Sequence, residues 1–179
     1  MSTLHAIDGP QERELLVAFF DLTRFHHYCK NHSDREVIDM LSAYYELVGD
    51  IIEEAGGTVI SFIGDAGLLA FPDTLVNEGV LALKTLKETG DAWLKDYGVP
   101  SEAIIKAHFG PVQCAQLGTR TNKQLDIIGL TVNTAALLSS RGIAITPQVF
   151  RKLDTNNRKL FKKHTPPVTY IPVEEKHRD

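Results

Sequence analysis

The order in which strand and helix patterns alternate is the feature of this chain that most limits its fold. A continuous apolar run at residues 14–22 predicts a buried strand, and residues 33–57 repeat apolar side chains at helical spacing. Residues 58–71 predict a hairpin around a Gly-Asp turn, and a second helix pattern at 74–98 precedes a strand pattern at 102–110. The resulting order, strand–helix–strand–strand–helix–strand, is the split βαβ arrangement.

Local signals define the ends of both helices. Ser33 and Glu36 form a capping box at the start of the first helix, and Gly56 and Gly57 predict its end. Gly98 predicts the end of the second helix. Each helix therefore has a predicted C-terminal end.

The rest of the chain adds elements to this core. Residues 111–118 are predicted to turn back as the hairpin partner of the strand at 102–110. The later patterns predict a strand at 126–129, a helix around 131–142, a strand at 142–146, a helical turn after Pro147 and a strand near 167–173. We therefore expect an α+β protein with a ferredoxin-like βαββαβ core and additional C-terminal strands and helix. One domain at 14–173 would lie between tails at 1–13 and 174–179.

The first crossover connection brings two carboxylates together. A right-handed connection makes the strands at 14–22 and 58–63 parallel, and in the split arrangement the strand at 66–71 lies between them. Asp21 ends the first strand and Asp65 lies in the hairpin turn, so the two side chains should be neighbours. Close carboxylates repel unless a cation bridges them. The pattern indicates a metal site, with a solvated Asp pair as the alternative.

Composition narrows the possible functions. The chain has 179 residues, a net charge of −4 and no long basic run, which argues against a nucleic-acid partner. Cys29 and Cys114 form neither a disulfide framework nor a metal-type spacing, which favours a reducing compartment. The N-terminus lacks a signal-peptide pattern, and the early apolar run at 15–20 is too short to span a bilayer. We expect a soluble cytoplasmic protein that binds neither nucleic acid nor a membrane.

Four motifs in register resemble those of one family. They are FFDLTRF at 19–25, SFIGDAGLLAF at 61–71, AHFGPVQCAQLG at 107–118 and LDIIGLTVNTAALL at 125–138. In that order they resemble the first metal motif, the second metal motif, the glycine-containing strand pair and the base- and ribose-binding segment of class III adenylate and guanylate cyclases. The resemblance covers residues 15–173, nearly the whole chain.

The resemblance implies a reaction and its cofactors. In this family the ribose 3′-hydroxyl attacks the α-phosphate of a nucleoside triphosphate, which gives a 3′,5′-cyclic nucleotide and pyrophosphate. Two divalent cations, Mg²⁺ or Mn²⁺, activate that hydroxyl and neutralise the triphosphate. By resemblance, Asp21 and Asp65 are the metal ligands, together with the backbone carbonyl of Leu22.

Substrate-binding residues are also implied by the resemblance. Phe25 and His26 occupy the turn whose backbone N–H groups bind phosphates at a helix start. Asp126 occupies the position that reads the base edge. Asn133 occupies the position that orients the ribose during catalysis.

The family divides its site between two chains, so that the metal-binding residues of one protomer face the base- and ribose-binding residues of the other. The resemblance therefore implies a head-to-tail homodimer, or a heterodimer with a complementary cyclase chain. The family's late phosphate-binding lysine corresponds to Lys162 or Lys163, and the loose match of this segment does not decide between them.

Two positions depart from the family pattern. The family's adenine-selecting lysine is replaced by Ser61, which can hydrogen-bond a base but selects less sharply. Its transition-state arginine is replaced by Leu137, and losing one such donor costs about 100- to 1000-fold in rate. Arg141 is the predicted catalytic replacement, because one helical turn would place it about 6 Å from Leu137. Arg120 in the preceding loop is a second candidate, and a cation that only stabilises the helix C-terminus is the structural alternative for Arg141.

Two functions follow from these observations. Asp21, Asp65, Asp126 and Asn133 favour an active nucleotidyl cyclase. Ser61 and Leu137 favour a weak or inactive cyclase-fold protein that binds nucleotides as a regulatory dimer. The base that would be cyclised is left open.

Overall fold

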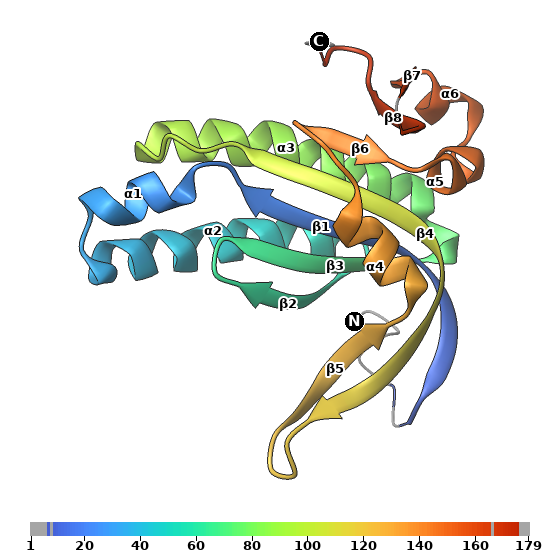
Figure 1. Ribbon diagram of the computed structural model, residues 1–179, viewed down its shortest axis with the longest axis horizontal. Helices are drawn as coiled ribbons and strands as arrows, with labels where there is room; N and C mark the ends of the chain where they lie inside the picture. The colour runs from blue at the N-terminus through green and yellow to red at the C-terminus, as the bar shows by residue number, and fades with distance from the viewer. Residues whose placement is uncertain (1–6, 8, 166, 176–179) are drawn as a thin grey trace.

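The computed structural model describes residue 7 and residues 9–165 and 167–175. Within them, eight strands form one sheet in the order β2-β3-β1-β4-β6-β8-β7, with β5 paired to β4 (Figure 1). The strands are β1 (Gln11–Leu22), β2 (Thr58–Ile63), β3 (Ala66–Pro72), β4 (Ala103–Gly118), β5 (Lys123–Ile128), β6 (Ile143–Ile145), β7 (Phe161–His164) and β8 (Thr169–Pro172). The helices are α1 (Phe25–Asn31), α2 (Asp34–Glu54), α3 (Val76–Tyr97), α4 (Leu130–Leu137), α5 (Pro147–Lys152) and α6 (Thr155–Arg158), with a 3₁₀ turn at Asp73–Leu75.

The predicted βαββαβ core is confirmed. β3 pairs antiparallel with both β1 and β2, so β1 and β2 run in the same direction with β3 between them. β4 pairs antiparallel with β1 on its other side, from Gln11 opposite Cys114 to Leu22 opposite Ala103. The end of β1 therefore lies at the same end of the sheet as the β2–β3 turn.

The two long helices have the predicted ends. The Ser33 hydroxyl accepts a hydrogen bond from the backbone of Glu36, and the Glu36 carboxylate accepts one from the backbone of Ser33, which completes the capping box of α2. Gly56 and Gly98 follow α2 and α3 with φ of 78° and 86°. A glycine adopts this left-handed conformation without the steric cost that a Cβ would impose.

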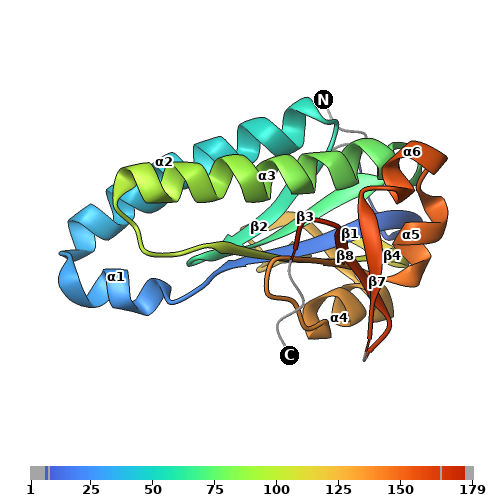
Figure 2. The same cartoon turned by 90° about the horizontal axis from the view of Figure 1, so that it is seen from above.

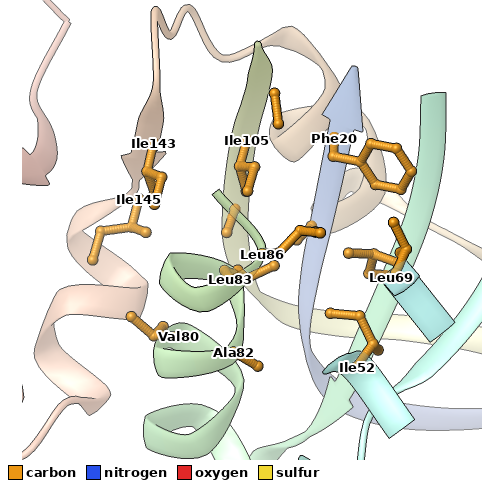
Figure 3. Packing of buried hydrophobic residues seen from close by; sticks show 14 of the residues in the cluster. Phe20, Ile52, Leu69, Val80, Ala82, Leu83, Leu86, Ile105, Ile143 and Ile145 are labelled. Atoms are coloured by element: carbon orange, nitrogen blue, oxygen red, sulfur yellow. The ribbon is translucent and has the colours of Figure 1, made fainter. Parts of the chain in front are cut away.

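Side chains of β1 alternate between two hydrophobic faces of the sheet. α2 and α3 cover one face (Figure 2), where Phe20 and Leu86 belong to the main core (Figure 3). α4 lies on the opposite face, where Val17 packs in a second core with Ala135. Because side chains alternate along a strand, Asp21 also points to the α4 side. We call this side of the sheet the α4 face.

The predicted hairpin between residues 102–110 and 111–118 is wrong. Both segments form the single long strand β4, and its hairpin partner is β5. The Gly110-Pro111 pair has a packing role instead of a turning role. A Cβ on Gly110 would lie 2.7 Å from the Thr131 hydroxyl, which donates a hydrogen bond of 2.7 Å to the Pro111 carbonyl. The missing side chain lets α4 approach the strand.

The predicted helix around 131–142 is shorter than expected. α4 ends at Leu137, and the next residue, Leu138, has extended backbone angles. Arg141 is therefore not on α4, and the helical spacing that made it the replacement for the family's arginine is wrong. The sequence patterns also missed β7 and α6, which are only four residues long each.

The edges of the predicted domain differ in detail from the structure. β1 begins at Gln11, before the expected start at residue 14. Glu174 forms an ion pair with Lys84 on α3, so the predicted C-terminal tail starts with a residue that contacts the domain. Of the two predicted tails, residues 7, 9–13, 174 and 175 are described. The other tail residues lie outside the described part of the chain. No helix in the described part of the chain is long and apolar enough to cross a membrane.

Candidate active site

The predicted carboxylate pair is present at one end of the sheet. Asp21 is the penultimate residue of β1, and Asp65 lies in the β2–β3 turn. Burial is the largest effect and raises the pKa of Asp65. The backbone N–H of Asp65 lowers that pKa in part, and the charge of Asp21 and a hydrogen bond with Asp21 each raise it by a smaller amount. The two side chains therefore interact directly, as the strand order predicted.

Residues from α2 and β1 hold the turn that carries Asp65. The Tyr45 hydroxyl on α2 donates a hydrogen bond to the Gly64 carbonyl, and the Tyr45 ring stacks on Phe62 with centroids 3.8 Å apart. A Cβ on Gly67, two residues after Asp65, would lie 2.3 Å from the Phe20 ring. The tight contact at Gly67 and the tyrosine hydrogen bond fix the turn against the end of β1.

The chemistry of this pair fits a hard divalent cation. Among the described residues, neither Asp21 nor Asp65 forms an ion pair with a basic side chain, so no cation in that part of the chain compensates their charges directly. In the described part of the chain, no group of three or more His, Cys, Asp or Glu side chains could hold a metal. Two carboxylates suit Mg²⁺ or Mn²⁺, which keep several water ligands and bind substrate phosphates as well.

The turn after β1 is tied to β4. The Thr23 N–H donates to the Glu102 carbonyl at 2.9 Å, and the Glu102 N–H donates to the Thr23 hydroxyl at 2.9 Å. Phe25 is buried at the start of α1, whereas His26 is exposed. Arg24, between them and β1, has a φ of 55°, a left-handed conformation that is strained for a residue with a side chain.

Ser61 and Asp126 line one cavity of about 360 Å³ between β2 and the β4–β5 hairpin, together with Ile60 and Leu125. A β-bulge between Val59 and Ser61 interrupts the regular pairing of β2 with β3. The Asp126 carboxylate accepts a hydrogen bond of 2.8 Å from the next backbone N–H. The structure thus brings together the two residues for which the sequence analysis predicted a role in base recognition.

α4 presents Asn133 and Leu137 on its exposed side. The inward-facing residues of the helix are Thr131 and Ala135, which are buried, whereas Asn133 is exposed and Leu137 is 84% exposed. Residues four apart share one side of a helix, so Asn133 and Leu137 point in a similar direction. Leu137, which the resemblance assigned to the position of the family's arginine, is therefore an exposed apolar side chain.

Arg141, Lys162 and Lys163 lie elsewhere. Arg141 lines a cavity of about 590 Å³ with Lys84 and Glu174, next to α3 and the C-terminal segment. Lys162 donates hydrogen bonds to the carbonyls of Val173, at 3.1 Å, and Glu175. Lys163 is exposed on β7, at the opposite edge of the sheet from β2. Within this chain, none of the three is brought to the Asp21–Asp65 pair.

One residue of the α4 face was missed by sequence reasoning. Lys106 on β4 lies opposite Phe19 of β1, and its ammonium donates a hydrogen bond of 2.8 Å to the Ala136 carbonyl near the end of α4. A lysine in the otherwise apolar strand segment AIIKA was the available signal. The register that places it beside Asp21 could be known only from the structure.

Comparison with known proteins agrees with the fold. Residues 8–168 match the family model described as the adenylate and guanylate cyclase catalytic domain. Adenylate cyclase 2 of Rhizobium meliloti is 25% identical over 166 residues, which are 89% of this chain and 44% of that protein. Human guanylyl cyclase C is 29% identical over 140 residues, which are 74% of this chain and 13% of that protein. The chain thus spans less than half the length of these relatives.

A solved structure extends the comparison to three dimensions. The match to the structure of a bacterial light-regulated adenylyl cyclase covers 97% of this chain and 56% of the cyclase chain, with a TM-score of 0.79 and 21% sequence identity. At this identity the likeness supports the fold alone.

Proposed function

The chain belongs to the family of adenylate and guanylate cyclase catalytic domains, and from this premise we propose that it converts a nucleoside triphosphate to a 3′,5′-cyclic nucleotide and pyrophosphate. The observation that carries the proposal is the direct interaction of Asp21 with Asp65, without a basic partner among the described residues. A carboxylate pair of this kind costs stability and is accounted for by a cation that bridges it. The cavity shared by Ser61 and Asp126 supports a bound base.

In the proposed site, the carboxylates of Asp21 and Asp65 and the carbonyl of Leu22 would hold two divalent cations. When bound, Mg²⁺ or Mn²⁺ would activate the ribose 3′-hydroxyl and neutralise the triphosphate. The 3′-oxygen bonds to the α-phosphorus, the bond from that phosphorus to the bridging oxygen breaks, and pyrophosphate leaves. Asn133 orients the ribose so that this attack is in line with the leaving group.

Base and phosphate contacts complete the proposed site. Ser61 and Asp126 hydrogen-bond the base edge, and the backbone at Phe25 and His26 binds phosphate oxygens. A hydroxyl both donates and accepts hydrogen bonds, so Ser61 selects less sharply than a lysine would. We propose relaxed selectivity between adenine and guanine.

We further propose that the site forms between two copies of the chain. Large apolar side chains are exposed on and beside α4, where Ile128, Leu130 and Leu137 are 56%, 80% and 84% exposed. A cluster of this kind marks a contact surface on a soluble domain. The partner copy would place its Asn133 and Asp126 opposite Asp21 and Asp65, while a heterodimer with a complementary cyclase chain is the alternative arrangement.

A second candidate function rests on a specific observation. Leu137 offers no charge to a developing phosphate, so a nucleotide-binding regulatory dimer with little turnover is the competing proposal. The two proposals share metal and nucleotide binding and differ only in product formation.

The test is incubation of the purified chain with each of the four nucleoside triphosphates and Mn²⁺, followed by chromatography for cyclic nucleotides and pyrophosphate. We expect a cyclic product that is lost in Asp21→Asn and in Asp65→Asn. Metal-dependent nucleotide binding without product would favour the regulatory dimer. If neither substitution weakens Mn²⁺-dependent nucleotide binding, the carboxylate pair is not a metal site and both proposals fail.

Sedimentation velocity tests the dimer separately. The unmodified chain should sediment as a dimer at micromolar concentration, and Leu130→Glu should sediment as a monomer because a charge cannot be buried unpaired in the contact. A monomer in both cases would contradict the shared site.

A further inference from the structure

A source of positive charge lies near α4, and its assignment to catalysis rests on the proposed cyclase reaction. That reaction develops negative charge on the α-phosphate and on the departing pyrophosphate, and a nearby cation would stabilise both. Leu137 cannot supply such a charge, and Arg141 lines a different cavity beside α3. Arg120 lies in the turn between β4 and β5, after the end of β4 at Gly118, whereas Asp21 pairs with Ile104 near the start of β4.

Lys106 lies on the α4 face next to Asp21. It pairs directly with Phe19, and the next pair on the same face of these two strands is Asp21 with Ile104. Diagonal neighbours on one face of an antiparallel pair are about 7–8 Å apart between Cα atoms. The backbone of Lys106 is thus next to the proposed metal ligand Asp21.

The Lys106 side chain extends from this position to the end of α4. Its ammonium lies 2.8 Å from the carbonyl oxygen of Ala136, the residue immediately before Leu137. The charge of Lys106 is therefore placed beside the position at which the family carries its arginine. Lys106, a strand residue on the α4 face, thus carries a positive charge next to the end of α4, where Leu137 carries none.

The bonding of this ammonium leaves capacity for a ligand. A lysine ammonium has three donors, and within the described residues Ala136 O is the single acceptor, with no carboxylate in an ion pair. The residue is half-buried, where a charge acts on a nearby anion more strongly than in bulk water. A carbonyl at a helix C-terminus holds the ammonium without neutralising it.

We propose that Lys106 is a catalytic residue that, together with α4 of its own chain, faces the nucleotide held by the partner's Asp21 and the partner's Asp65, contacts the phosphates of that nucleotide and takes over the role of the arginine absent at Leu137. Its ammonium donates to an oxygen of the α-phosphate or of the departing pyrophosphate. It transfers no proton and forms no covalent bond. The structural alternative is a lysine that only caps α4.

Binding and turnover together distinguish these two roles. In Lys106→Met the side chain keeps its length and loses its charge, and Lys106→Arg restores the charge. We expect Lys106→Met to weaken Mg²⁺-dependent binding of inorganic pyrophosphate at least tenfold by calorimetry. Binding of the α,β-methylene analogues of ATP and GTP should weaken by less, because the charge that Lys106 stabilises is fully developed only on the departing pyrophosphate. The same substitution should lower kcat at least tenfold and leave adenosine and guanosine binding unchanged. Lys106→Arg should recover most of both losses.

Lys159→Met is the matched control, because Lys159 is exposed at the end of α6 and its substitution changes net charge equally. Equal affinities of the unmodified chain and Lys106→Met for pyrophosphate and both analogues would overturn the proposal, whatever the change in thermal stability. A loss of nucleoside binding as large as the loss of pyrophosphate binding would also overturn it, because that result indicates displacement of α4.

The outcome separates this proposal from the proposed function. If the unmodified chain binds neither analogue with Mg²⁺ or Mn²⁺, the cyclase function itself fails and Lys106 has no substrate to contact. If the unmodified chain binds them and Asp65→Asn weakens that binding while Lys106→Met leaves the binding of pyrophosphate and of both analogues unchanged, the cyclase function stands and only the role of Lys106 is wrong.

Discussion

Asp21 raises the pKa of Asp65, in addition to the larger effect of burial on the Asp65 carboxyl. The two residues come from different elements, the end of β1 and the β2–β3 turn, and the sheet order places them together. Their interaction is unfavourable when both are ionised, so the fold contains a local cost to stability at the point where we propose that metal binds.

The first prediction is that Asp65→Asn stabilises the metal-free protein and weakens metal binding. The folded-state pKa of Asp65 lies above its unfolded value, so ionisation destabilises the fold and the cost is complete above that folded pKa. At pH 7 the melting temperature of Asp65→Asn should exceed that of the unmodified chain, and this gain should shrink as pH falls through the folded pKa. Mn²⁺ affinity, measured with a bound nucleotide analogue, should fall at least tenfold.

Asp73→Asn serves as the control for this pair of measurements, because Asp73 is exposed in the 3₁₀ turn. It should leave the melting temperature and Mn²⁺ affinity unchanged. A lower melting temperature for Asp65→Asn would show that Asp65 stabilises the turn and that the repulsion is not important.

The second prediction concerns the hydrogen bond that holds the turn. Tyr45→Phe removes the hydroxyl that donates to the Gly64 carbonyl but keeps the ring that stacks on Phe62. A net hydrogen bond contributes about 1 kcal/mol, so we expect Mn²⁺ affinity to fall about fivefold as the turn loosens. Tyr97→Phe, which changes a 46% exposed tyrosine beside Trp93, is the control. Equal metal affinity in both variants would exclude a positioning role for Tyr45.

The third prediction is that Arg24→Gly increases the free energy of unfolding by about 1 kcal/mol. A residue with a Cβ pays about 1–2 kcal/mol in the left-handed region, and glycine does not, although its extra freedom in the unfolded state offsets part of the gain. Urea denaturation of Arg24→Gly and Arg24→Ala checks this, because Ala retains the steric cost. Equal stability of the Gly and Ala variants would show that Arg24 is not strained.

The sequence predicted the features of the fold that depend on local signals and on strand order. The capping box at Ser33 and the glycine after α3 mark helix ends through bonds to near neighbours, so they could be recognised in one segment. The Asp21–Asp65 contact followed from the handedness of one crossover. The continuity of β4 through Gly110 could not be predicted, because it depends on the approach of Thr131 from a helix that follows later in the chain.

The candidate site shows the same limit. Ser61 and Asp126 were expected near one base from the resemblance, and the structure places them on one cavity. Arg141 was misplaced because the end of α4 at Leu137 carries no strong stop signal in the sequence. Lys106 was missed because its relation to Asp21 and Ala136 depends on the β1–β4 register and on a contact with α4.

The fourth prediction concerns base selection by the cavity of Ser61 and Asp126. Ser61→Lys should shift the ratio of α,β-methylene ATP to α,β-methylene GTP affinities about tenfold towards ATP, since a charged donor adds roughly 1.4 kcal/mol to one base over the other. Asp126→Ala should change the ranking of the two bases and leave the melting temperature within 1–2 °C, roughly the range expected for a surface substitution. An equal loss for both analogues would assign Asp126 a structural role.

The last prediction links Leu137 to Lys106. Metal ligands act on the triphosphate in the ground state and the transition state alike, whereas a cation near the α-phosphate acts mainly as charge develops there. Leu137→Arg should therefore raise kcat more than affinity, by about 10- to 1000-fold in a chain that lacks any other cation at the site. If Lys106 already occupies this role, the gain will be small in the unmodified chain and large in Lys106→Met. The four turnover numbers form a double-mutant cycle whose interaction energy measures the overlap between the two positions. Equal gains in both backgrounds would mean that the two cations act independently and that Lys106 does not replace the missing arginine.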